Sequence, residues 1–195
     1  MAGLMDVLTQ TLGGDTTERI SREVGANPAA TSAAIAAALP MLLAGLNRNA
    51  ADPAGAEALH GALAKDHDGS ILDNLGGFLG NAQAGPGAGI LKHVLGDRKD
   101  AATEVVGQAS GLDKQQVMAL LVTLAPVVLG ALGRAQRERN LDPGGLASVV
   151  GDAQAQQAQA APDLMGMATQ MFDRNADGSI LDDVMRGVGG LLGRK

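Results

Sequence analysis

One kind of segment constrains the fold of this chain more than any other: an uncharged apolar stretch that contains a proline and occurs twice. The first copy spans residues 28–46 (PAATSAAIAAALPMLLAGL) and the second spans residues 115–133 (QQVMALLVTLAPVVLGALG), with Pro40 and Pro126 at equivalent places. A helix that is apolar on every side is typical of an element surrounded by other elements. We therefore expect two buried central helices. Each should kink or restart near its proline, because proline removes a backbone hydrogen bond and clashes with the preceding turn.

The two segments are also close to the length that crosses a lipid bilayer, about 20 predominantly apolar residues. The first copy consists largely of alanine, which contributes little transfer free energy compared with Leu, Ile or Phe. The chain has no Trp or Tyr that would mark a membrane interface. We therefore prefer buried central helices and expect no membrane partner, with a membrane span as the alternative, mainly for the second copy.

Composition favours an all-α fold. The chain has 195 residues, of which 46% are hydrophobic and 18% charged, as in globular proteins. Strand-forming residues are sparse, no useful alternating pattern occurs, and the 28 glycines and many alanines favour close helix packing. The absence of cysteine excludes disulfides and thiolate zinc sites. The N-terminal residues do not form a secretory signal, so we expect a cytoplasmic protein.

The sequence contains an internal duplication. A shift of 86 residues aligns the two prolines, the Thr-Glu pairs at 17 and 103, and the glycines at 25 and 111. After a four-residue insertion, Asp-Pro at 52–53 aligns with Asp-Pro at 142–143, and the motif DGSILD recurs at 68–73 and 177–182. Fixed-period similarity of this kind indicates repeated structural units.

Each repeat is predicted to contain the same series of helices. The expected helices cover residues 2–12, 15–24 and 28–46 in the first repeat and 89–96, 98–109 and 115–133 in the second; a short helix opened by Asp-Pro and a final helix after DGSILD follow in each. We divide the chain into a first repeat (1–84), a Gly/Pro linker (85–89) that should not be helical, and a second repeat (90–195). The second repeat carries a Gln/Ala-rich insertion at 151–162, which suits a surface helix or spacer. We expect one shared core, because each repeat alone would expose part of an apolar helix.

Three features together resemble a known family: the proline-containing apolar helix, the DHDGSILDNL box at 66–75, and GAGILKHVLG at 87–96. They look like the bacterial domain of unknown function 937 family, which is related to the YidB-like proteins. The resemblance covers nearly the whole chain and implies an all-α bacterial domain. It implies no activity, because the family has none that could be transferred.

The DGSILD motif has a structural explanation in both copies. Its glycine permits a tight turn, and Ser70 or Ser179 can cap the next helix. Asp73 or Asp182, three residues later, would complete a capping box. We therefore predict a helix start at each copy.

The residues around the second copy also match a calcium-binding EF-hand loop. Asp173, Asn175 and Asp177 stand at loop positions 1, 3 and 5, with glycine at position 6. Position 12 is Val184 instead of the usual glutamate, so Asp182 or Asp183 would have to substitute for it. The metal-ligand candidates are therefore Asp173, Asn175, Asp177 and Asp182. In the first copy position 1 is an alanine, which leaves Asp66 and Asp68 alone and makes calcium less favoured there.

No enzyme motif occurs in the sequence. There is no phosphate loop or nucleophile elbow, and the three histidines lie in different segments without metal-ligand spacing. The net charge of −6 disfavours nucleic acid as a partner. Gly25 lies where a helix-turn-helix would turn, but no basic residue occurs between Arg22 and Arg48 to read bases. The cluster of arginines at 134, 137 and 139 is interpreted as the solvated end of the second central helix.

The sequence therefore predicts a non-catalytic, all-α interaction or self-assembly module that forms homo-oligomers or binds a protein partner. The alternative is a calcium-responsive binding protein that uses the loop at 173–183. DNA binding and membrane association come behind these two. No cofactor other than calcium is suggested.

Overall fold

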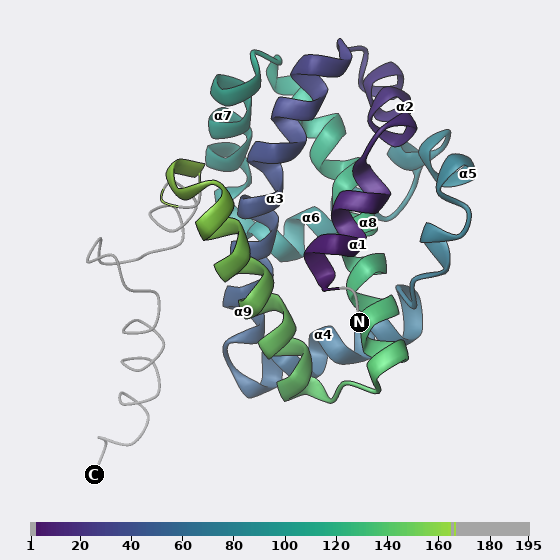
Figure 1. Cartoon of the computed structure of the whole chain (residues 1–195), viewed down its shortest axis with the longest axis vertical. Helices are drawn as coiled ribbons and strands as arrows, with labels where there is room; N and C mark the ends of the chain where they lie inside the picture. The colour runs from purple at the N-terminus through teal and green to yellow at the C-terminus, as the bar shows by residue number, and fades with distance from the viewer. Residues whose placement is uncertain (1–2, 165, 167–195) are drawn as a thin grey trace.

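The computed structural model describes residues 3–164 and 166 (Figure 1). These residues form helices and no strand, which confirms the predicted all-α class. The α-helices are α1 (Leu4–Leu12), α2 (Asp15–Val24), α3 (Pro28–Ala50), α4 (Pro53–Asp66), α5 (Leu75–Leu79), α6 (Gly87–Leu95), α7 (Lys99–Ser110), α8 (Lys114–Arg139) and α9 (Pro143–Ala160). Three short 3₁₀-helices join them: η1 (Ser70–Leu72), η2 (Ala82–Ala84) and η3 (Gly96–Arg98).

The two central helices, α3 and α8, form the middle of the molecule, and the other helices pack around them (Figure 1). In the part of the chain that the structure describes, they are the two helices long and apolar enough to cross a membrane. Their most apolar windows are 72% and 83% buried inside the protein. The prediction of buried central helices is therefore confirmed.

Both central helices continue through their prolines. Pro40 lies inside α3 and Pro126 inside α8, and each is buried. Of the two expected outcomes, a restart of the helix is therefore wrong, and a kink stays a prediction. An interior proline costs roughly 3 kcal/mol in an isolated helix, but here the helix is packed on nearly all sides, and tertiary contacts outweigh the local penalty.

The helix ends follow signals in the sequence. Asp52 and Asp142 cap α4 and α9: each accepts a hydrogen bond from the backbone N–H of the third residue of its helix, and each is followed by proline. Gly25 and Gly111 end α2 and α7 in the left-handed conformation, with φ of 66° and 74°. These four boundaries agree with the prediction.

Helices from the two halves of the sequence pack on each other. α3 contacts α7 and α9 from the second half, and α8 contacts α1, α2 and α4 from the first. One cluster of buried apolar residues runs through both halves and includes Leu8, Leu43, Leu91 and Leu124. Much of the surface of each central helix is thus covered by helices from the other half of the sequence.

Glycines allow the closest of these contacts. Gly45 of α3 lies against α6, where a methyl group at Gly45 would come within 2.5 Å of the Val94 carbonyl oxygen. Gly87 of α6 lies against α8 in the same way, because a methyl group there would come within 2.1 Å of the Val122 carbonyl oxygen. The backbone of α6 therefore approaches both central helices directly.

One predicted boundary is wrong. Residues 87–89, assigned to a non-helical linker, form the first turn of α6, because the Gly87 backbone packs on α8 and the packing holds it in the helix. Of the two alternatives for the Gln/Ala-rich insertion, the helix agrees with the structure: residues 151–160 continue α9, mostly at the surface, with Ala153 and Gln157 buried.

The contact between α3 and α6 leads to a first prediction. Gly45→Ala should lower the free energy of unfolding by about 1–3 kcal/mol, because the new methyl group forces two backbones apart. Gly61→Ala in α4 is the matched control: nothing lies within 4 Å of its added methyl group, and the helix gains up to about 1 kcal/mol. Urea unfolding of both variants measures the difference. A Gly45→Ala protein as stable as the wild type would contradict the close packing described here.

Candidate functional site

The first DGSILD motif lies across the C-terminal half of α8. We call residues 67–73 the box segment. Its backbone touches the helix: a methyl group at Gly133 would come within 1.7 Å of the His67 carbonyl oxygen. One turn earlier, Gly130 faces the side chain of Ile71. Because these two glycines of α8 have no side chains, the segment packs directly against the backbone of the helix.

Two arginines of α8 bind the box segment at this position. Arg134 donates hydrogen bonds from Nη2 to the Gly69 carbonyl (3.2 Å) and to the Asp73 carboxylate. Arg137 donates from Nη1 to the Asp68 carboxylate at 3.3 Å. The carboxylates of the motif therefore face guanidinium groups, in pairs separated by more than 60 residues in sequence.

Asp68 has a second local partner. Its Oδ1 accepts a hydrogen bond from the backbone N–H of Ser70 at 3.0 Å. This bond is the main cause of a lowered pKa for the Asp68 carboxyl, and Arg137 lowers it further. The Asp68 carboxylate is therefore ionised near neutral pH. Its hydrogen bond to Ser70 is part of a turn in which Gly69 has φ of 95°.

The predicted capping box is wrong for the first motif. Ser70 starts η1, a single 3₁₀ turn, and its side chain caps no helix. Asp73 pairs with Arg134 instead of completing a capping box. The next helix, α5, is capped by Asn74, whose side-chain oxygen accepts a hydrogen bond from the Gly77 N–H at 3.2 Å. The prediction considered only local partners, and an arginine from a distant helix competes for the aspartate.

The interpretation of the arginine cluster as a solvated helix end is also wrong for Arg134. Its side chain is only 26% exposed, whereas that of Arg137 is 55% exposed. Both pair with the box segment. No local signal in the sequence indicates these pairings, because only the fold brings residues 68–73 next to α8.

A second polar contact lies beside the box segment, where α4 meets the end of α8. His60 of α4 lies with Nε2 3.0 Å from the Leu141 carbonyl oxygen, and Gln136 donates from Nε2 to the His60 carbonyl at 3.3 Å. The Gln136 Oε1 atom is buried and has no hydrogen-bond partner among the described residues. His93, by contrast, is exposed on α6.

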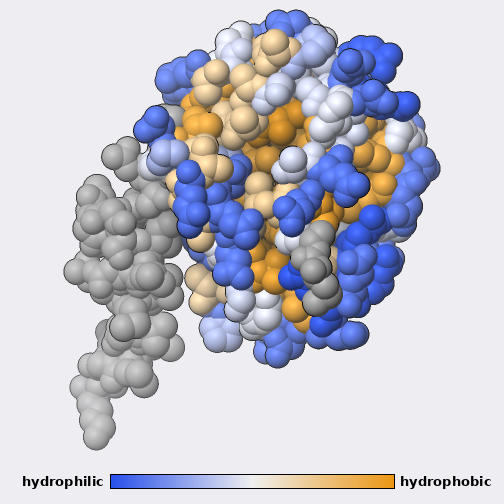
Figure 2. Space-filling model, viewed as in Figure 1, coloured by the Kyte–Doolittle hydropathy of each residue, from blue (hydrophilic) through white to orange (hydrophobic). Residues whose placement is uncertain are grey.

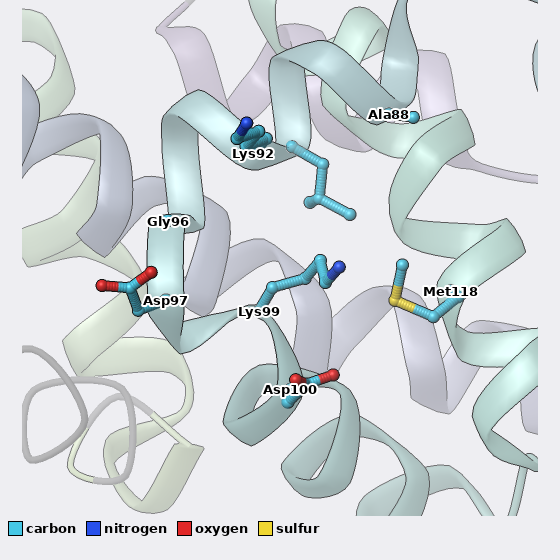
Figure 3. Close-up of a pocket in the computed structure, with 8 residues that line it drawn as sticks. Ala88, Lys92, Gly96, Asp97, Lys99, Asp100 and Met118 are labelled. Atoms are coloured by element: carbon cyan, nitrogen blue, oxygen red, sulfur yellow. The ribbon is translucent and has the colours of Figure 1, made fainter.

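A hollow of about 500 Å³ opens between α6, η3, the start of α7 and α8 (Figure 3). Its apolar lining comes from Ala88, Leu91 and Met118, and its charged lining comes from Lys92, Lys99, Asp97 and Asp100. Figure 3 shows the Lys99 ammonium group extending into the opening toward Met118. Asp100 also pairs with Lys114 at 3.3 Å. Two cations and two anions line the hollow, so its lining has no net charge.

The predicted calcium ligands Asp173, Asn175, Asp177 and Asp182 lie outside the described residues. Within residues 3–164 and 166, no group of three or more His, Cys, Asp or Glu side chains comes together in a way that could hold a metal ion. The second loop therefore stays a prediction from sequence.

The arginine contacts generate a prediction about stability. Arg134→Met should lower the free energy of unfolding by about 1–2 kcal/mol, because the Gly69 carbonyl and the Asp73 carboxylate lose their hydrogen-bond donor. The loss is no larger because solvent already weakens the partly exposed Arg134–Asp73 pair. Arg137→Met should cost less than Arg134→Met, because the Arg137–Asp68 pair is more exposed. Chemical denaturation compares the two. Equal losses would show that burial does not decide the strength of these contacts.

His67 generates a prediction about pH. Burial lowers the pKa of His67 below its ordinary value of 6.5, and the neighbouring Asp66 opposes this shift. As the pH falls through 6.5, the unfolded chain therefore takes up a proton before the folded protein does. The free energy of unfolding should fall over this range, until the pH passes the folded-state pKa.

Melting temperatures between roughly pH 7.5 and pH 5 measure this dependence. His67→Gln should flatten the curve, whereas His93→Gln, at an exposed position, should follow the wild type. If His67→Gln loses stability in parallel with the wild type, His67 does not cause the dependence.

Comparison with known proteins agrees with the resemblance drawn from the motifs. No curated protein and no solved structure matches the chain. A family described as "Bacterial protein of unknown function (DUF937)" matches residues 6–135, from α1 through most of α8. The match includes the box segment and Arg134, which donates hydrogen bonds to Gly69 and Asp73 of that segment. The chain belongs to the DUF937 family of bacterial proteins.

Proposed function

We propose that this chain is a non-catalytic interaction module, built from two duplicated helical units, that associates with copies of itself. The observation that carries the proposal is an uncharged apolar area on the surface over α7 and the adjoining half of α3 (Figure 2). We call it the α3–α7 face. Its residues are Ala29, Ala33, Ala36, Ala101, Val105 and Ala109, which are exposed or half-exposed.

The order of the helices supports the duplication. Helices α1 to α4 have 9, 10, 23 and 14 residues, and α6 to α9 have 9, 12, 26 and 18 residues in the same order. The third helix of each series contains the proline, and the fourth begins with the capped Asp-Pro pair. Two related units in one chain offer related surfaces, one of which can fit the other.

The α3–α7 face differs from the corresponding surface of the first half. The sequence shift of 86 residues places Ala101, Val105 and Ala109 of α7 where α2 has Asp15, Arg19 and Glu23. Spacing of four residues puts the α7 side chains on one face of the helix. Contiguous apolar surface of this kind marks interaction sites more often than isolated apolar residues do.

The polar groups of the box segment support a role without catalysis. Asp68, Asp73, Arg134 and Arg137 pair with one another, and His60 contacts a backbone carbonyl. Groups that bind and activate substrates must keep part of their hydrogen-bonding capacity for them. In this segment a part of that capacity fixes one loop on one helix.

Self-association through the α3–α7 face has a geometric consequence. If the face of one copy contacts a different surface of the next copy, the contact is heterologous and need not close into a ring. Small side chains on the face allow helices to approach closely. Open, concentration-dependent assemblies are the expected products.

The test is the molar mass in solution over a range of concentrations, from light scattering and sedimentation. The wild-type mass should rise with concentration, and Ala101→Glu should weaken association by roughly tenfold or more, because it buries a charge at the contact. Position 101 is near the start of α7, where a glutamate suits the helix dipole, so folding should be preserved.

Ala58→Glu is the matched control, since Ala58 is an exposed alanine on α4 away from the face. This control should associate like the wild type. A wild-type protein that stays monomeric at high concentration, or equal association of the Ala101→Glu and wild-type proteins, would refute the proposed function.

A further inference from the structure

The two related helices α2 and α7 are covered differently. α5, which follows the first DGSILD motif, packs on α2: a methyl group at Gly76 would come within 2.9 Å of the Arg19 guanidinium. α7 packs against α3, α6, α8 and η3 on its inner side. Its outer positions Ala101, Val105 and Ala109, which align with the charged positions of α2, form part of the α3–α7 face.

The central helices can be compared in the same way. On α8, the Gln83 side chain of η2 donates from Nε2 to the Ala119 carbonyl at 3.0 Å and to the Thr123 hydroxyl at 3.1 Å. Ala119 aligns with Ala33 of α3 under the same 86-residue shift. Ala33 belongs to the α3–α7 face. The chain that follows the first motif thus contacts α2 at Arg19 and α8 at Ala119, positions that are exposed or half-exposed, as are Ala33 and the aligned positions of α7.

The sequence contains a second copy of the covering segment. DGSILD recurs at 177–182, and GGLLG at 189–193 corresponds to GGFLG at 76–80 in α5. From the first of these motifs to the second, Leu181, Val184, Val188 and Leu192 stand at helical spacing, so a helix there would have one apolar side that needs a partner. The segment 177–195 has three acidic and three basic residues and therefore no net charge, which suits an uncharged surface.

We propose that residues 177–195 dock on the α3–α7 face of the same chain, as α5 docks on α2, and that they compete there with a second copy. This inference rests on the proposed function, because residues 177–195 would regulate access to the face through which copies associate. α9 packs along α3, which α7 also contacts, so the chain leaves the described part close to this pair of helices. The ten residues 167–176 could span up to roughly 30 Å when extended, enough to reach the face.

The absence of cysteine in the natural chain permits a direct test. The full-length Val105→Cys variant carries one thiol on the face, and its alkylation rate with a small maleimide is measured at high dilution. The same variant with Leu191→Asp and Leu192→Asp has an apolar segment that should no longer dock. Thr9→Cys, at an exposed site on α1, controls for general reactivity, and Ala109→Cys replaces Val105→Cys if the latter does not fold.

The docked segment should make alkylation at position 105 slower than at position 9. If docking is favoured about ten to one, the double Asp substitution should raise the alkylation rate at position 105 roughly tenfold or more. The same substitution in the chain without cysteine should strengthen self-association by a similar factor, because more copies have a free face. Alkylation at position 105 that is fast and unaffected by Leu191→Asp and Leu192→Asp overturns the inference.

Concentration distinguishes the docked segment from a second copy. Protection at dilution that does not change with concentration supports docking within one chain. Protection that appears only as concentration rises means that another copy covers the face, which overturns docking within one chain while leaving the proposed self-association intact. Conversely, protection at dilution combined with no effect of Ala101→Glu on association would refute the proposed function alone.

Discussion

Burial of two apolar helices is the constraint on which the rest of this structure depends. Neither α3 nor α8 has a polar side wide enough to face water, so each needs neighbours around most of its circumference. The neighbours come from both halves of the sequence: α7 and α9 cover α3, while α1, α2 and α4 cover α8. Because the core contains no Trp or Tyr, it is filled by leucine, valine and alanine at short distances between helices. Glycines such as Gly45 and Gly87 are placed where backbone meets backbone.

Much of the fold could be predicted from the sequence, because its strongest signals are local. The all-α class, the central helices and the ends of α2, α4, α7 and α9 follow from apolar runs, Asp-Pro starts and terminal glycines. The errors occurred where tertiary packing outweighed a local rule. Pro40 and Pro126 do not interrupt their helices, and Gly87 is helical although it follows a Gly-Pro pair. In each case the surrounding helices supply contacts that no window of sequence contains.

Less of the candidate site could be predicted. The DGSILD motif was identifiable, but the partners of Asp68 and Asp73 were not, because Arg137 and Arg134 lie 69 and 61 residues away. A capping box and an ion pair use the same aspartate, and only the position of α8 decides between them. The α3–α7 face was equally hidden, since alanines on a helix have no signature that separates a buried side from an exposed one. Comparison of the two halves, position by position, is what makes the uncharged side of α7 stand out.

The interleaved packing of the two halves also affects how the protein can be made. Synthesis proceeds from the N-terminus, so α3 is complete at residue 50, whereas α7 begins at Lys99 and α9 ends at Ala160. At about 5–20 residues per second, a ribosome needs on the order of 5–20 s to add the hundred or so residues that finish this covering. During that interval an apolar helix has no permanent neighbours on one side and is open to chaperones, to other nascent chains and to membranes. The arrangement that buries α3 well in the finished protein therefore leaves it exposed during translation.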